Sequence, residues 1–299
     1  MKRFTKRLVV VAGGVFLAAF ALLWGQLPAL GAGGLLHPAR HTTALSAPEH
    51  CVTTEFAGAG VTLKGWRCSS AVPSRGTIVY LHGIADNRGS ASGVIPRFLA
   101  RGFNVIAYDS RAHGESQGDA CTYGFFEKQD LHRVIDTLGP DPVVLIGTSL
   151  GAAVALQEAA DDPRVTAVVA AETFSDLRTV AAERAPAFFT SGTIDRAFEI
   201  AEREGRFRVD DVQPQRFAQR ITVPVLIIHG VADVETPPAH SERVYAALKG
   251  PKRLIMVPGA GHNGSLRSEV WKQIEQGIDD MLSNSRKVQV NPSLSASWH

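Results

Sequence analysis

A strand-like run that leads directly into a glycine-flanked serine is the feature that most constrains this chain. Val143–Ile146 is wholly apolar, and Gly147, Ser149 and Gly151 follow it in the pattern Gly-x-Ser-x-Gly. The next residues, Ala152–Leu156, are small or apolar and favour a helix. A strand that turns this sharply into a helix leaves no space for side chains two positions before and after the turn. The sequence therefore predicts a strand–turn–helix unit that exposes the Ser149 hydroxyl above a sheet edge.

Apolar runs alternate with helical stretches along most of the chain. Strands are expected at 77–81, 104–108, 143–146, 165–170, 225–228 and 254–257, and helices at 90–101, 125–138, 149–160, 239–248 and 265–282. Strands without a polar face, separated by helices, are typical of a parallel sheet covered on both sides. The predicted fold class is therefore α/β, with a mostly parallel central sheet, helices on both faces and a small helical cap. The cap is assigned to about 174–221, which contains helix-like pieces and no strong strand.

Two further residues with catalytic chemistry follow later strands. Asp233 lies just after one apolar run, and His262 lies just after the next. Carboxyl ends of parallel strands share one sheet edge, so both residues are expected beside Ser149. A serine nucleophile needs a base, and the base needs an acid that orients it. We expect His262 to be the general base and Asp233 the acid, with Glu235 as the alternative acid.

Two backbone amides at this edge are expected to hold a developing oxyanion. One belongs to Leu150, directly after the serine, and the other to Ile84, in the turn after the first central strand. Because the amides donate, the side chains at these positions are free to vary.

Three other polar features are interpreted as structural. His82 and His229 each precede a glycine at a strand end, which favours a scaffold role over a catalytic one. The polar loop 108–116 is expected to be hydrogen-bonded beside the site, with Asp109 capping it or pairing with Arg111.

Together these motifs resemble the α/β-hydrolase superfamily, over roughly residues 61–282. The motifs are His82-Gly83, Tyr108-Asp109-x-Arg111-x-His113-Gly114-x-Ser116, Gly147-Thr148-Ser149-Leu150-Gly151, His229-Gly230-x-x-Asp233-x-x-x-Pro237 and Gly261-His262. The chain is most similar to bacterial, often membrane-anchored hydrolases related to the serine aminopeptidase and monoacylglycerol lipase-like group. Residues 121–131 also resemble a stretch of that group. Thr148 and residues 234–236 depart from its usual pattern.

The resemblance implies a serine hydrolase that cleaves a carboxylic ester of a small molecule or lipid through an acyl-enzyme on Ser149. Such chemistry needs no metal or cofactor. A peptidase or amidase of the serine aminopeptidase type is the first alternative, and a catalytically idle binding protein is the second. The small, charged cap favours short to medium acyl chains. A formal net charge of +2 excludes a general affinity for nucleic acid.

The N-terminus carries a targeting signal. Four basic residues within positions 2–7 precede an uncharged run, 8–36, that is typical of a membrane anchor or a secretory signal peptide. Either one exports the catalytic domain, which would be membrane-anchored outside the cytoplasm or, after cleavage, secreted or periplasmic. The expected organisation is an anchor at 1–36, a linker at 37–50, the catalytic domain at 51–283 and a flexible tail at 284–299. The oligomeric state is left open.

Three cysteines agree with export. Cys51 and Cys68 flank two alternating strands around Gly58–Gly60, which predicts a hairpin. The two cysteines are symmetric about its turn and would face each other. Pairing of Cys68 with Cys121, or three free thiols, remain alternatives.

Overall fold

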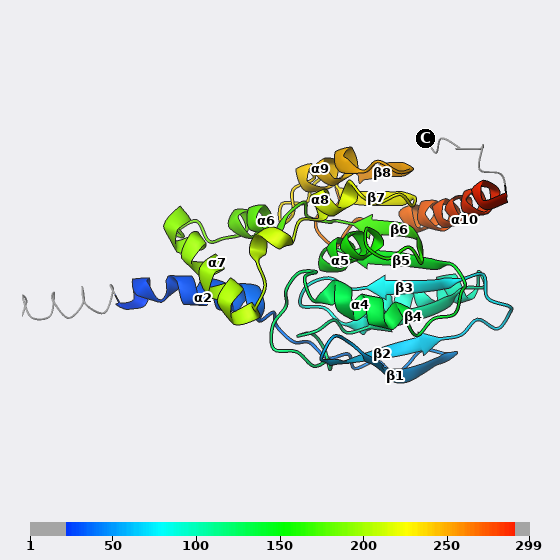
Figure 1. Ribbon diagram of the computed structural model, residues 1–299, viewed down its shortest axis with the longest axis horizontal. Helices are drawn as coiled ribbons and strands as arrows, with labels where there is room; N and C mark the ends of the chain where they lie inside the picture. The colour runs from blue at the N-terminus through cyan, green and yellow to red at the C-terminus, as the bar shows by residue number, and fades with distance from the viewer. Residues whose placement is uncertain (1–21, 291–299) are drawn as a thin grey trace, which may run out of the picture.

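The computed structural model describes residues 22–290, and one eight-stranded sheet organises them (Figure 1). The strand order is β1–β2–β4–β3–β5–β6–β7–β8. β1 and β2 pair antiparallel with their neighbours, and all other pairs are parallel. The strands are β1 (Cys51–Ala57), β2 (Thr62–Cys68), β3 (Thr77–Leu81), β4 (Asn104–Tyr108), β5 (Val143–Thr148), β6 (Val165–Ala171), β7 (Val225–Gly230) and β8 (Lys252–Val257). The predicted α/β fold class is confirmed.

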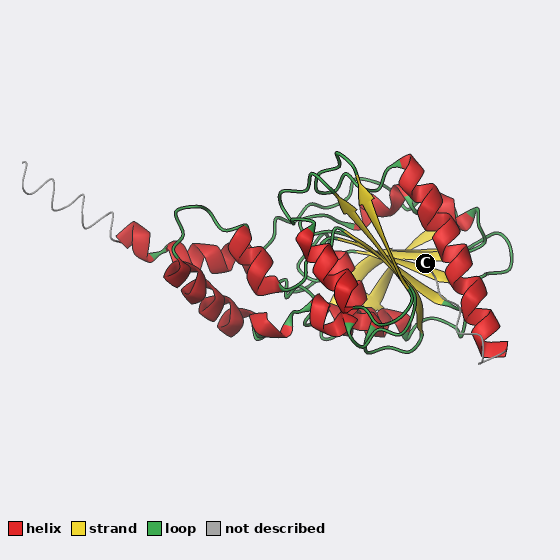
Figure 2. Cartoon of the chain, turned by 90° about the horizontal axis from the view of Figure 1, so that it is seen from above, coloured by secondary structure: helices red, strands yellow, loops and turns green. Residues whose placement is uncertain are grey.

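Helices cover both faces of the sheet (Figure 2). They are α3 (Ile95–Leu99), α4 (Glu127–Ile135), α5 (Leu150–Ala159), α8 (Pro214–Ala218), α9 (Ala239–Ala247) and α10 (Ser268–Val290). The single helix expected at 90–101 was wrong, because the structure has two shorter helices there, a 3-10 helix η1 (Arg88–Gly93) followed by α3. Pro96 has no N–H to continue a helix from upstream, and it lies in the first turn of a new helix instead. α10 reaches Val290, inside the expected tail, and 291–299 lie outside the described residues.

Alternate residues of the central strands enter two separate cores. Ile78 and Tyr80 pack with α3 and α10 on one face, whereas Val79 and Leu81 pack with α4 and α5 on the other. All five residues of β3 are therefore buried. Such double burial explains why the central strands have no polar face.

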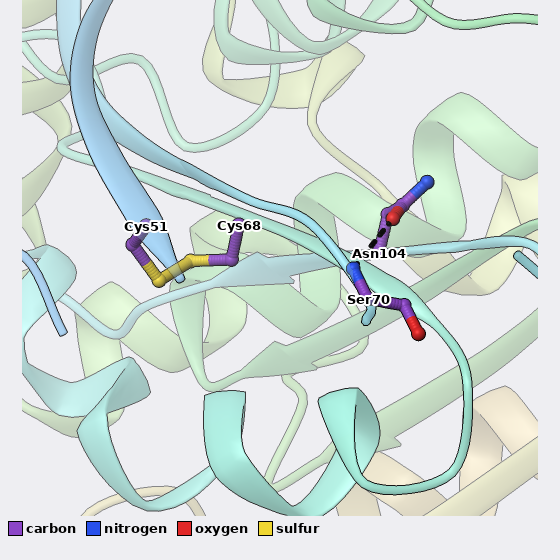
Figure 3. Close-up of a disulfide and its surroundings, with 4 residues drawn as sticks. All are labelled: Cys51, Cys68, Ser70 and Asn104. Carbon is purple, nitrogen blue, oxygen red and sulfur yellow. Dashed lines mark hydrogen bonds between the residues drawn. A yellow bond between two sulfur atoms is a disulfide. The ribbon is translucent and has the colours of Figure 1, made fainter. Parts of the chain in front are cut away.

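The predicted hairpin is present, and a disulfide closes it. Cys51 and Cys68 are partners in the β1–β2 register and form a disulfide bond (Figure 3). Directly after β2, the Ser70 amide donates to Asn104 Oδ1 at 3.0 Å, tying the hairpin to β4. The third cysteine, Cys121, has a free thiol whose pKa is raised well above its usual value by burial.

The segment between β6 and β7 forms the cap. Its helices α6 (Leu177–Glu183) and α7 (Ser191–Gly205) project beyond one end of the sheet (Figure 1), and a 3-10 helix η2 (Val209–Asp211) follows. α8 also lies in the expected interval, but it packs on α5 and α9 and so belongs to a layer beside the sheet.

The helix α2 (Leu27–Leu36) packs along α7, a contact that no sequence pattern predicted (Figures 1 and 2). It is the end of the expected anchor, of which residues 1–21 lie outside the described residues. Between 22 and 290, no helix combines the length and apolar character that crossing a bilayer requires. Side chains of the expected linker contact the backbone of the catalytic domain. His37 Nδ1 lies 2.7 Å from Asp119 O, and the Arg40 guanidinium donates to Ser116 O at 2.8 Å.

Candidate active site

Ser149 sits on a turn that only glycine neighbours allow. Its backbone is left-handed, with φ 49° and ψ −111°, and its amide donates to Ala171 O at 2.8 Å. A Cβ on Gly147 would lie 2.3 Å from the Gly151 backbone, and one on Gly151 would lie 2.1 Å from Leu81 O. Both distances are below any real contact, so each glycine is a steric requirement of the strained turn.

The structure places the three predicted catalytic residues within hydrogen-bond distance of one another, in the order Ser149, His262, Asp233. His262 Nε2 lies 3.1 Å from Ser149 Oγ, and His262 Nδ1 lies 2.7 Å from Asp233 Oδ2. A carboxylate can only accept, so Nδ1 carries the proton and Nε2 is left to accept one from the serine. This tautomer can remove the hydroxyl proton of Ser149.

Asp233 receives hydrogen bonds at both oxygens. The amides of Glu235 and Thr236 donate to Oδ1 at 3.0 and 2.9 Å. His229 Nε2 lies 3.3 Å from Oδ2 and 2.8 Å from Thr236 O. His229 is fully buried and, as expected, does not contact Ser149; it helps to orient the acid.

The alternative acid, Glu235, lies away from the histidine. Its carboxylate is 61% exposed and 3.7 Å from the Arg184 guanidinium. Arg184 ends the cap helix α6 and also donates to the Glu235 carbonyl at 2.7 Å. Glu235 thus joins the acid loop to the cap instead of contacting His262.

Glu172 positions the histidine loop, and the sequence analysis missed it. Its carboxylate accepts from the amides of Asn263 at 2.6 Å and Ser265 at 3.0 Å, on the residues that follow His262. Glu172 is buried and has φ 56°. An acidic residue directly after the apolar strand β6, at the edge where Ser149 lies, was the available signal.

The Ile84 and Leu150 amides belong to two segments that adjoin Ser149. Leu150 opens α5, so its N–H has no acceptor within the helix. The Ile84 loop is adjacent, because a Cβ on Gly83 would lie 3.7 Å from Ser149 Cβ. Neither amide has a hydrogen-bond acceptor among residues 22–290, so both are free to bind an oxyanion.

His82 holds this loop, in line with the scaffold role expected for it. Its Nδ1 donates to Gly83 O at 2.7 Å, and its Nε2 accepts from the Ser110 amide at 2.9 Å. Burial lowers the pKa of His82, which keeps the ring neutral. A neutral ring is required, because one nitrogen must accept.

The polar loop 108–116 is hydrogen-bonded as expected, but its ion pairs differ. Asp109 pairs with Arg88, not with Arg111. Arg111 pairs with the buried Asp130, its Nε 2.7 Å from Oδ2. Of the two roles expected for Asp109, capping the loop is confirmed, since its carboxylate accepts from the Glu115 amide at 2.9 Å. Pairing with Arg111 is wrong, because the partners from η1 and α4 come close only in the folded protein.

A second serine–histidine–carboxylate arrangement joins the cap to α9. Ser175 Oγ lies 2.8 Å from His240 Nδ1, and His240 Nε2 lies 2.8 Å from Glu183 Oε2. Ser175 is fully buried and also donates to Asp176 Oδ2 at 2.9 Å. No substrate can reach it, so this arrangement is structural.

An apolar pocket of about 530 Å³ begins at Ile84 and extends beneath the cap. Its walls come from α2, α6, α7 and the segment that joins α6 to α7, and Ile84 and Tyr123 complete the lining. Within the part of the chain that the structure describes, Arg184 is the one charged residue in its lining. The volume is within the usual range for small-molecule sites.

One group within residues 22–290 has a geometry suited to a metal, namely His132, Glu158 and Asp162. Arg164 already pairs with Asp162 at 2.7 Å. Glu158 is near the end of α5, about 13 Å along the helix from its start beside Ser149. A metal held there would not reach the serine.

Comparisons with known proteins agree on the fold. A family model described as alpha/beta hydrolase fold matches residues 76–208, and one described as PhoPQ-activated pathogenicity-related protein matches 201–298. The uncharacterized protein YfhR of Escherichia coli is 30% identical over 237 residues, 75% of this chain and 78% of YfhR.

Two solved structures show the same fold at low identity. The Pyrococcus furiosus esterase Pf2001 aligns with a TM-score of 0.67 and 22% identity, over 83% of this chain and 98% of the esterase. The acylaminoacyl peptidase of Pyrococcus horikoshii aligns with a TM-score of 0.62 and 17% identity, over 80% of this chain and 42% of the peptidase.

Proposed function

Because the chain belongs to the α/β-hydrolase superfamily, we propose that it is a serine hydrolase that cleaves carboxylic esters. The observation that carries the proposal is the 3.1 Å approach of His262 Nε2 to Ser149 Oγ, beside two amides that have no acceptor among the described residues. A non-catalytic binding protein has no need for a strained serine in contact with an oriented histidine.

The proposed reaction is acyl transfer to water. Ser149 Oγ attacks the ester carbonyl while its proton passes to His262 Nε2. Asp233 stabilises the resulting imidazolium, and the Ile84 and Leu150 amides bind the oxyanion. His262 then protonates the departing alcohol. Water, deprotonated by His262, attacks the acyl-enzyme and releases the acid.

The charge of the pocket supports an ester over a substrate with a free amino terminus. An aminopeptidase must bind a protonated amino terminus, for which a carboxylate is the matching partner. Among the described residues that line the pocket, the one charged side chain is Arg184, a cation that would repel an ammonium group. The apolar lining suits an acyl chain instead.

Labelling with a fluorophosphonate tests the nucleophile. The probe should modify the wild-type protein and leave Ser149→Ala unmodified, and ester turnover should fall at least a thousandfold. Ser175→Ala serves as the matched control and should retain labelling. Equal labelling of the Ser149→Ala protein would reject the assignment, and faster turnover of aminoacyl amides than of acyl esters would favour the peptidase alternative.

We propose in addition that the N-terminal segment places this domain outside the cytoplasm, at a membrane or after release from one. The basic residues before an uncharged run support it, as does the Cys51–Cys68 disulfide, a bond that persists in oxidising compartments. When the disulfide is reduced in intact cells, a membrane-impermeant thiol reagent should label the protein from outside. Cell fractionation then tests where the full-length chain is recovered. Recovery of the full-length chain in the cytosolic fraction would contradict the proposal.

A further inference from the structure

One face of α2 lines the pocket. Leu27, Leu30, Gly31, Gly34 and Leu35 are spaced i, i+3, i+4, i+7 and i+8, which places them on a single side of the helix. The N-terminal segment therefore supplies a wall of the cavity that begins at the proposed oxyanion loop.

This wall is fixed to the cap. A Cβ on Gly31 would lie 2.9 Å from the Phe189 ring and 3.1 Å from Ala197 Cβ, so the glycine lets α2 approach α7 closely. On another side of α2, Leu36 is fully buried, and a Cβ on Gly205 of α7 would lie 2.9 Å from it.

The wall is also fixed to the catalytic domain. The Tyr123 hydroxyl donates to Leu35 O at 3.0 Å, and the Cys121 amide donates to Leu36 O at 2.8 Å. α2 is thus held from two sides, and the space between it and the cap is a defined part of the fold.

We propose that α2 forms the acyl-binding wall of the active site and sets the length of acyl chain that the enzyme accepts. This rests on the proposed ester hydrolysis. With the ester carbonyl at Ser149, the acyl chain passes Ile84 and enters the apolar cavity that this residue lines. A chain long enough to reach α2 buries methylenes there, whereas an acetyl group does not.

The surroundings of the pocket indicate a lipid-like substrate. Leu30 and Phe188, which line it, are 66% and 57% exposed. Exposed apolar side chains grouped beside an apolar cavity mark a binding surface. The substrate class that fits is an amphiphilic ester with a medium-length acyl chain, entering along α2.

Two neighbouring glycines give a matched test. A Cβ on Gly34 or on Gly33 would meet nothing within 4 Å, but only Gly34 lines the pocket. Gly34→Leu fills the cavity, whereas Gly33→Leu makes the same change outside it. Both gain the same helix propensity, so an effect on folding would appear equally in the two variants.

The full-length chain, in one detergent throughout, is assayed with p-nitrophenyl acetate and octanoate. The octanoate-to-acetate ratio of kcat/KM should fall at least tenfold in Gly34→Leu and should stay near the wild-type ratio in Gly33→Leu. Equal octanoate-to-acetate ratios in the two variants would overturn the proposal.

Calorimetric titration with decanoate separates this proposal from the proposed hydrolysis. Wild type and Gly33→Leu should bind the anion, and Gly34→Leu should bind it at least tenfold more weakly. If Ser149→Ala kept full esterase activity while Gly34→Leu lost decanoate binding, the proposed hydrolysis at Ser149 would be rejected. The proposal that α2 binds the acyl chain would be supported. Equal decanoate binding by the two glycine variants would reject the proposal that α2 binds the acyl chain, whatever their esterase activity.

Discussion

Replacing Asp233 by asparagine tests the proposed catalytic triad most directly, because both oxygens of this carboxylate accept hydrogen bonds. One oxygen accepts from the Glu235 and Thr236 amides, and the other accepts from His262 Nδ1. The backbone amides cannot reverse their polarity, so an asparagine must direct its carbonyl oxygen to them. Its NH₂ group then faces His262 and selects the ring tautomer that accepts at Nδ1.

The expected loss follows from that tautomer. With its proton on Nε2, His262 presents a donor to Ser149 and cannot take up the hydroxyl proton. Inverting the tautomer in this way lowers kcat by about 10⁴-fold in a serine protease, which corresponds to about 5.5 kcal/mol of transition-state stabilisation. The fold should persist, since both backbone amides keep an acceptor.

Steady-state hydrolysis of p-nitrophenyl butyrate by Asp233→Asn, with circular dichroism as the folding check, measures this loss. Glu235→Gln is the control, because the Glu235 side chain is exposed and does not contact His262. We expect it to stay within twofold of wild type. Retention of more than a tenth of the activity by Asp233→Asn, or a comparable loss in Glu235→Gln, would refute the assignment of the acid.

Two further predictions concern stability. Gly151→Ala should lower the free energy of unfolding in urea by at least about 2 kcal/mol, because its Cβ would lie 2.1 Å from Leu81 O. Gly139→Ala, where a Cβ would meet nothing, should change it by less than about 1 kcal/mol. Similar effects of the two changes would contradict the steric argument. Burial lowers the pKa of His113 to about 4, so the unfolded chain takes up a proton first as pH falls through 6.5 and the folded state loses stability from there down to about pH 4. Between pH 7 and pH 5, wild type should therefore lose about 2 kcal/mol more than His113→Gln, and parallel stability curves would show that His113 is not the group responsible.

Much of the site could be predicted because its signals are local in the chain. The glycines around Ser149 are dictated by the steric needs of one turn, and Asp233 and His262 each follow an apolar strand. Once the strands are parallel, their carboxyl ends must share an edge, and the structure does bring the three residues together there. The strand positions could be predicted for a similar reason, since burial on both faces removes polar residues from the central strands.

Contacts between segments far apart in the chain could not be predicted from any local pattern. Arg88 and Asp109 pair across a loop, and Glu172 supports the residues after His262 from another strand end. The same holds for the use of α2. A glycine-rich apolar run has the same sequence whether it lies in lipid or against another helix, because both environments are apolar and both accept small residues at close approach. The sequence by itself determined the chemistry at the sheet edge, which depends on single residues and their spacing. Only the tertiary structure decided what forms the pocket beside it, because a cavity wall depends on which surfaces meet.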